Sequence, residues 1–191
     1  MIKIGILGGI GSGKSFISKQ FGYPVFDADK QVKKIYKSDK NCFFQLKKKL
    51  PNYIFSFPIK KSELKKAILG NRKNLSIINK IVHLLVRKKM REFFKKNYRK
   101  KIVILDVPLL IENKLDKNKY ILIFIDAKKN QIIKRLKLRK NYSPNIFRRL
   151  NKFQLGLDQK RKKSNYIIKN DFKKNTIKKS AKMIIKKILN K

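Results

Sequence analysis

Residues 8–15 read Gly8-Gly9-Ile10-Gly11-Ser12-Gly13-Lys14-Ser15, and this stretch decides the fold. It directly follows the apolar run 2–7 and directly precedes the run 16–21, whose sequence is Phe-Ile-Ser-Lys-Gln-Phe. A strand, a glycine-rich loop and a helix, in this order, are the context in which the pattern G-x-x-x-x-G-K-S forms a phosphate site. The stretch therefore predicts a loop that binds a nucleoside triphosphate.

The chemistry of this loop follows from its residue types. Glycines let backbone N–H groups converge on phosphate oxygens, and the N-terminus of the next helix adds partial positive charge. Lys14 can reach the β- and γ-phosphates, and the Ser15 hydroxyl is placed to bind Mg²⁺. We therefore predict a nucleotide site made of Gly9, Ile10, Gly11, Ser12, Gly13, Lys14 and Ser15. A dinucleotide-binding fold is disfavoured, because these glycines do not follow the pattern G-x-G-x-x-G.

Apolar runs along the chain predict the rest of the core. Five of them have the character of buried parallel strands, namely Ile2–Leu7, Tyr23–Phe26, Ile102–Leu105, Tyr120–Ile125 and Tyr166–Ile168. Most are followed by a polar residue and then by a helical pattern, which is typical of a doubly wound α/β fold. We therefore predict a five-stranded parallel sheet that binds ligands at the carboxyl ends of its strands.

The long gap between the second and third predicted strands interrupts this alternation. It contains no obvious strand but three helical patterns, at residues 43–50, 62–69 and 75–97. Ser62 is the expected N-cap of the second of these helices. We expect residues 31–99 to form a helical acceptor domain inserted into a nucleotide-binding core of residues 1–30 and 100–191, with a lid at about 136–150.

The charge of the chain is extreme. Its 53 Lys and Arg residues against 11 Asp and Glu give a formal net charge of +42. Such an excess is typical of proteins that bind nucleic acid or anionic membranes. However, Lys, Asn and Ile are abundant together along the whole chain, as compositional pressure from an A/T-rich genome would produce. No motif of an RNA-binding module is present, so we expect only incidental affinity for polyanions and no membrane partner.

The cysteine content bears on the cellular compartment. Cys42 is the only cysteine, so it cannot form an internal disulfide, and no metal-binding spacing surrounds it. The first predicted strand begins at Ile2 with no hydrophobic leader before it. These features predict a cytoplasmic protein, which we expect to be a monomer or a weak oligomer.

Five of the 11 acidic residues follow the predicted strands. These are Asp27 and Asp29 after the second strand, Asp106 and Glu112 after the third, and Asp126 after the fourth. In a doubly wound fold these positions lie at or near the edge that carries the glycine loop. We therefore expect at least two of the five to be catalytic.

Their positions suggest different roles. Asp106 directly follows a buried strand, as does the acidic residue that holds Mg²⁺ in nucleoside-triphosphate-binding enzymes. An alcohol acceptor benefits from a carboxylate that takes its proton during phosphoryl transfer, and Asp29 is the candidate for this base. Asp27 is expected to position the acceptor or to support the loop.

Arg135 and Arg139 are one turn apart on a predicted helix over 131–140 and border a break at 141–144. A mobile lid would carry arginines at such a place, where they stabilise negative charge on the phosphates. Two ordinary surface charges would give the same pattern, and the residues alone leave both interpretations open. His83 is the only histidine and lies in the long inserted helix; considered by itself, it is expected to be a packed or capping residue rather than a catalytic one.

Together these motifs resemble the dephospho-coenzyme A kinase family over nearly the whole chain. The matching elements, in order, are the glycine loop, Asp27-Ala28-Asp29, His83, Pro108-Leu109-Leu110 with Glu112, Lys134-Arg135 with Arg139, and Gln154 ahead of a strand ending at Asn170. The sequence departs from the family at Leu7, Leu84 and Asn165, where a Thr, a Pro and an Asp are usual.

The resemblance implies a reaction and roles for its residues. In the family, ATP with Mg²⁺ phosphorylates the ribose 3′-hydroxyl of dephospho-coenzyme A, the small-molecule substrate, to give coenzyme A and ADP. By position, Asp29 is then the base, Lys14 with Arg135 or Arg139 serves the phosphates, and Ser15 with Asp106 holds the metal. Asp27, Asp29, His83 and Glu112 belong to the acceptor site, and Asn170 to the nucleotide site.

Two other functions stay open at this point. One is another small-molecule kinase that phosphorylates a hydroxyl, similar to shikimate kinase, although the long insertion and residues 108–112 argue against it. The other is an ATP-dependent nucleic-acid-binding protein, which the net charge of +42 suggests. The second predicts that RNA or DNA binding changes the rate of ATP turnover, whereas incidental electrostatic binding does not.

Overall fold

A parallel sheet forms the centre of the nucleotide-binding part of the chain. The computed structural model describes residues 1–107, 120–138, 143–144 and 155–190. Its strands are β1 (Ile2–Gly8), β2 (Val25–Asp27), β3 (Ile102–Asp106), β4 (Ile121–Asp126) and β5 (Tyr166–Lys169). They pair in the order β2-β3-β1-β4-β5, and every pairing is parallel. The predicted α/β class and five-stranded parallel sheet are therefore confirmed, with strand ends shifted by up to two residues.

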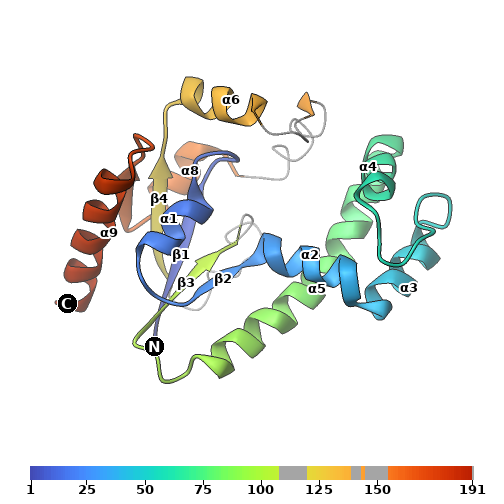
Figure 1. The fold of residues 1–191 in the computed structure, drawn as a ribbon, viewed down its shortest axis with the longest axis horizontal. Coiled ribbons are helices and arrows are strands. Elements are labelled where there is room, and N and C mark those ends of the chain that lie inside the picture. Colours follow the sequence, from blue (N-terminus) through green and yellow to red (C-terminus); the bar gives the residue numbers. More distant parts are fainter. Residues whose placement is uncertain (108–119, 139–142, 145–154, 191) are drawn as a thin grey trace. The chain divides into compact units, whose positions relative to one another are not determined.

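Helices α1 (Lys14–Gln20) and α9 (Lys174–Leu189) lie side by side against this sheet (Figure 1). Ile4 and Ile6 of β1 are fully buried and belong to the same apolar cluster as Ile17 of α1 and Ile177 of α9. Alternate strand residues point to the same face of a sheet, so the two isoleucines serve one interface. This packing fixes the end of β1, from which the glycine loop starts.

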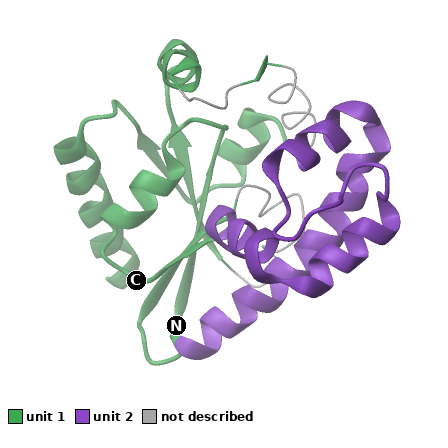
Figure 2. Ribbon diagram, turned by 45° about the vertical axis from the view of Figure 1, so that its right-hand side comes forward, with its two compact units in different colours: residues 1–27, 97–191 green, residues 28–96 purple. Residues whose placement is uncertain are grey.

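The chain divides into two compact units (Figure 2). Unit 1 comprises residues 1–27 and 97–191, and includes α6 (Lys129–Lys137) and α8 (Leu157–Lys162) besides the elements above. Unit 2 comprises residues 28–96 and contains α2 (Ala28–Ser38), α3 (Lys40–Lys49), α4 (Lys61–Gly70) and α5 (Arg72–Lys96). Among the described helices, none is both long and apolar enough to cross a bilayer.

Within unit 2, the long helix α5 packs against each of the other three helices. Its buried residues recur at helical spacing and include Leu75, Ile78, Val82 and Val86. The side chain of Asp39 caps α3 by accepting a hydrogen bond from the Cys42 amide at 2.8 Å. Unit 2 therefore has an apolar core of its own around α5.

Two local predictions were wrong, and one helix was not predicted. Helix α2, which was not predicted, begins at Ala28, directly after β2. The N-cap of α4 is Lys60 rather than Ser62, and Ser62 lies inside that helix. Helix α6 ends at Lys137 rather than at 140, and its C-cap Leu138 is 85% exposed.

Candidate active site

The loop between β1 and α1 has the backbone conformation that its glycines permit. Gly11 and Gly13 have φ values of 84° and 90°, in the left-handed region that side chains disfavour. Gly13 is the N-cap of α1 and has no side chain between the helix end and the solvent. The amides of Phe16 and Ile17 donate to the Gly13 carbonyl, at 3.1 and 3.0 Å. The N–H groups at the very start of a helix have no intrahelical partner and point toward a ligand at that end, which suits phosphate oxygens.

Lys14 lies against this loop. Its ammonium group donates hydrogen bonds to the carbonyl oxygens of Gly9 at 2.7 Å and Gly8 at 3.1 Å. Ser15 follows in the first turn of α1, is exposed, and has no acidic residue beside it in that turn. The loop therefore presents an ammonium group, a hydroxyl and backbone N–H groups around one place, which is the chemistry that binds a polyphosphate.

Neighbouring elements press closely on the loop glycines. A Cβ atom at Gly11 would lie 3.0 Å from atoms of Ile132 and Leu136, both on α6. A Cβ atom at Gly9 would lie 3.4 Å from the side chain of Leu157 on α8. The loop is thus in contact with two helices, and the contact is tight at Gly11, where a side chain would require α6 to shift, and ordinary at Gly9.

Asn170 ties the residues after β5 to the loop. Its side-chain amide nitrogen donates a hydrogen bond to the Ser12 carbonyl at 2.8 Å, and its side-chain oxygen accepts one from the Phe172 amide at 2.8 Å. Its own backbone amide bonds the Asp126 carbonyl at 2.7 Å, so its position is fixed from β4 as well. Asn170 is buried, and we interpret it as a support of the loop backbone.

The Ser12 hydroxyl is a second polar group inside the loop. The side chain of Ser12 is 1% exposed, and its oxygen has no hydrogen-bond partner within the described part of the chain. A buried polar group without a partner is disfavoured by about 1–3 kcal/mol. The hydroxyl is therefore suited to bind a ligand of the loop.

Arg135 lies on the face of α6 that meets the loop. It shares this face with Ile132 and Leu136, since residues three and four apart are neighbours on a helix. Its guanidinium stacks over the ring of Phe172, with 4.5 Å from the guanidinium carbon to the ring centre. Of the two predicted arginines, only Arg135 can be placed, because Arg139 lies outside the described residues.

Two of the predicted carboxylates come together at the edge of the sheet. Asp27 and Asp106 end neighbouring strands and are partners in the register of β2 and β3. Asp106 is buried, with 4% exposure, whereas Asp27 is half-buried. Among the described residues, no group of three or more His, Cys, Asp or Glu side chains could hold a metal ion on its own.

The remaining predicted site residues divide between unit 2 and undescribed segments. Asp29 is exposed in the first turn of α2. His83 lies on α5 and is half-buried; its pKa is lowered from 6.5, first by burial and then by the charge of Arg87. Glu112 and most of the predicted lid at 136–150 lie outside the described residues.

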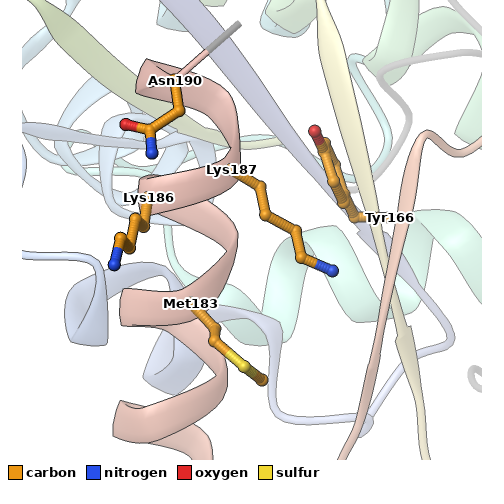
Figure 3. Close-up of a pocket in the computed structure, with 5 residues that line it drawn as sticks. All are labelled: Tyr166, Met183, Lys186, Lys187 and Asn190. Carbon is orange, nitrogen blue, oxygen red and sulfur yellow. The ribbon is translucent and has the colours of Figure 1, made fainter.

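A separate hollow of about 560 Å³ lies between α9 and β5 (Figure 3). Tyr166, Met183, Lys186, Lys187 and Asn190 line it. Tyr166 is the first residue of β5, while the glycine loop follows the last residue of β1. Because the strands are parallel, the hollow and the loop belong to opposite edges of the sheet, and the hollow is not part of the phosphate site.

Comparison with known proteins decides between the alternatives. A family model described as dephospho-CoA kinase matches residues 2–176, which is most of the chain. The chain belongs to the dephospho-CoA kinase family. A member from Wolbachia pipientis wMel is 33% identical over 170 residues, which cover 86% of this chain and 87% of that protein. The resemblance predicted from the motifs is therefore confirmed.

Solved structures support the fold. A dephospho-CoA kinase from Campylobacter jejuni has a TM-score of 0.65 at 22% identity and covers 97% of this chain and 96% of its own. A shikimate kinase from Acinetobacter baumannii has a TM-score of 0.54 at 14% identity, with coverages of 100% and 94%. At these identities the likeness extends to the fold alone, which the family shares with shikimate kinases.

The structure also accounts for one departure from the family and for several residues that the sequence analysis missed. Asn165 accepts a hydrogen bond from the Leu122 amide at 2.8 Å and so holds the start of β5 against β4. Leu157, Phe172 and the α6 contacts with the loop were not predicted. These residues are far from the loop in the sequence and form no recognisable motif with it, because only folding brings them next to the glycines.

Proposed function

We propose that the chain transfers the γ-phosphoryl group of ATP to the ribose 3′-hydroxyl of dephospho-coenzyme A, giving coenzyme A and ADP. Membership of the dephospho-CoA kinase family supports this reaction most directly. In the reaction the 3′-oxygen forms a bond to the γ-phosphorus, and the bond between that phosphorus and the β–γ bridging oxygen breaks. The acceptor proton passes to a base, and the leaving oxygen becomes part of ADP.

The glycine loop would hold the phosphates of ATP. The first N–H groups of α1, the ammonium of Lys14 and the Ser12 hydroxyl are its donors, and backbone groups of Gly9, Ile10, Gly11 and Gly13 complete it. Asn170 would contribute by fixing the Ser12 carbonyl, and thereby the direction of the neighbouring N–H groups. Binding to preorganised donors stabilises the negative charge of the transferring group.

The residues of the site fit Mg²⁺ as a companion of ATP. Ser15 and Asp106 offer oxygen ligands, which Mg²⁺ prefers, and few protein ligands are needed where substrate phosphates supply the others. When bound, Mg²⁺ would neutralise charge on the β- and γ-phosphates. Ser15, in the first turn of α1, and Asp106, at the end of β3, would be its protein ligands.

Asp29 is the proposed base, and unit 2 the proposed acceptor domain. Asp29 is two residues beyond Asp27, so the end of β2 ties it covalently to the sheet edge that carries the loop. Asp27 and Asp29 would bind the acceptor hydroxyl, and His83 and Glu112 would make further contacts with the acceptor. His83 would act as a neutral imidazole near pH 7, because burial lowers its pKa.

Arginines would stabilise the transition state. Arg135 is supported by its place on the α6 face that packs on the loop. Arg139 is assigned to the same task from the proposed lid. A guanidinium binds phosphate through two parallel N–H donors, which suits the equatorial oxygens of the transferring group.

We also propose a cytoplasmic monomer or weak oligomer with no specific nucleic-acid partner and no membrane partner. A buried free thiol at Cys42 supports a reducing compartment. The charge of +42 would give salt-sensitive polyanion binding without an effect on ATP turnover.

An Asp29→Asn variant tests the assignment of the base. We expect coenzyme A formation to slow by about 10²–10⁴-fold, the usual contribution of a general base, while both substrates still bind. Glu92→Gln is the matched control, since it removes an equal charge from an exposed pair with Lys89 on α5. Full activity of Asp29→Asn, in a preparation whose wild type makes coenzyme A, would remove Asp29 from the mechanism.

A further inference from the structure

The stack of Arg135 on Phe172 orients the arginine without using its donors. The guanidinium carbon lies over the ring, 4.5 Å from the ring centre, which is the arrangement of a cation–π contact. Such a contact uses the charge of the group rather than its N–H donors, which can still bind phosphate oxygens. An exposed arginine that pivots freely would spread these donors over many directions, whereas a stacked one presents them in few.

Phe172 itself is held in place by the support of the glycine loop. Its backbone amide donates to the side-chain oxygen of Asn170, whose side-chain nitrogen donates to the Ser12 carbonyl. Phe172 has a φ of 63°, a left-handed conformation that is uncommon for any residue other than glycine, asparagine or aspartate. Such a conformation persists where the surroundings enforce it, and here the Asn170 hydrogen bond does so.

The helix that carries Arg135 is fixed from its other side. Ile132 and Leu136, three residues before and one after Arg135, pack on Gly11 of the loop. Arg135 is therefore linked to the loop twice, through the packing of α6 and through the sequence of contacts from Phe172 by way of Asn170 to Ser12. A change at Phe172 removes one link and leaves the other.

We propose that Phe172 is a positioning residue of the phosphoryl-transfer site, which acts by orienting the Arg135 guanidinium toward the phosphates on the glycine loop. This proposal rests on the role of Arg135 in the proposed function. It assigns to Phe172 a part in the rate of transfer, although Phe172 is not expected to contact ATP or the acceptor.

Two variants of Phe172 distinguish the effect of its ring on activity from the effect of its left-handed backbone conformation. Phe172→Asn removes the ring but suits a left-handed φ, so thermal stability is expected to stay near that of the wild type. Phe172→Tyr keeps the ring and should retain activity. An exposed cation–π contact corresponds to about a two- to fivefold effect, so kcat of Phe172→Asn should fall by about that factor with the KM for dephospho-coenzyme A unchanged.

A double-mutant cycle with Arg135→Ala shows whether Phe172 acts through the arginine. If it does, Phe172→Asn lowers kcat in the wild type but not in the Arg135→Ala background. An equal loss in both backgrounds, or a kcat of Phe172→Asn equal to wild type, would overturn the proposal. Wild-type activity of Arg135→Ala would overturn it too, because Arg135 would then have no part in the reaction. The proposed reaction itself is tested independently, by whether the unmutated chain forms coenzyme A.

Discussion

Replacement of Gly13 by alanine tests how the glycine loop is held. Two effects act at this position. Its φ of 90° disfavours any side chain, at about 1–2 kcal/mol for an L-residue in the left-handed region. In addition, the new Cβ atom would lie 2.6 Å from the side-chain nitrogen of Asn170, closer than such atoms approach.

The second effect has a defined consequence. To relieve the overlap, Asn170 must move, and it then loses its hydrogen bond to the Ser12 carbonyl. Leaving these buried groups without partners costs about 1–3 kcal/mol. Gly13→Ala is therefore expected to lower the free energy of unfolding of unit 1 by about 2–5 kcal/mol, the sum of these two ranges.

Gly22→Ala is the matched control. Gly22 also has a positive φ, of 76°, but a Cβ atom there would meet no atom within 4 Å. It should show only the conformational cost of about 1–2 kcal/mol. Urea unfolding followed by far-UV circular dichroism measures both variants, and ATP affinity should fall for Gly13→Ala alone.

The Asn170→Ala background completes this test. With the Asn170 side chain removed, Gly13→Ala should cost no more than Gly22→Ala does, because nothing remains to be displaced. Equal losses of unfolding free energy in Gly13→Ala and Gly22→Ala would contradict a role of Asn170 at this position. An unchanged loss for Gly13→Ala after removal of the Asn170 side chain would contradict it as well.

Three further predictions concern unit 2. Because His83 is the only histidine, its imidazole proton signals can be followed by NMR; we expect a pKa below 6.5 that rises in Arg87→Gln, and a value at or above 6.5 contradicts this. As the pH drops, the His83 imidazole is protonated in the unfolded chain before it is protonated in the folded one, so stability falls from about pH 6.5 toward the lower folded pKa. Urea titrations at several pH values should detect this loss, and His83→Gln should abolish it. Burial and the nearby charge of Asp39 raise the pKa of the Cys42 thiol to about 12, so a thiol reagent at pH 8 should react slowly with the native chain. The reaction should be faster with Asp39→Ala, which loses a helix cap worth about 1 kcal/mol. Equal reaction rates of the two proteins would contradict the role of Asp39 as a cap.

Local patterns were sufficient to predict the sheet and the loop. The apolar runs that became β1 and β3 are short, continuous and followed by polar residues, and the glycine pattern specifies its own backbone conformation. Helix α2 was not predicted, although its buried residues Ala28 and Ile35 are seven positions apart, which is the spacing of two helical turns. The apolar runs and the glycine pattern depend only on residues that are close together in the sequence, so the sequence alone predicts them.

The supports of the site could not be predicted in the same way. Asn170 contacts Ser12 across 158 positions of the chain, and no local feature encodes a contact at that separation. The predicted helix over 131–140 was wrong at its end, since α6 stops at Lys137. The pairing of Arg135 with Arg139 stays a prediction, because Arg139 lies outside the described residues.

Coenzyme A formation tests the central claim most directly. Purified chain is incubated with ATP, Mg²⁺ and dephospho-coenzyme A, with shikimate and RNA in parallel reactions, and both ADP and coenzyme A are measured. We expect equal amounts of ADP and coenzyme A with dephospho-coenzyme A, and no stimulation of ADP formation by shikimate or RNA. Folded, ATP-binding protein that forms no coenzyme A, or that turns over ATP only with shikimate or RNA, would contradict it.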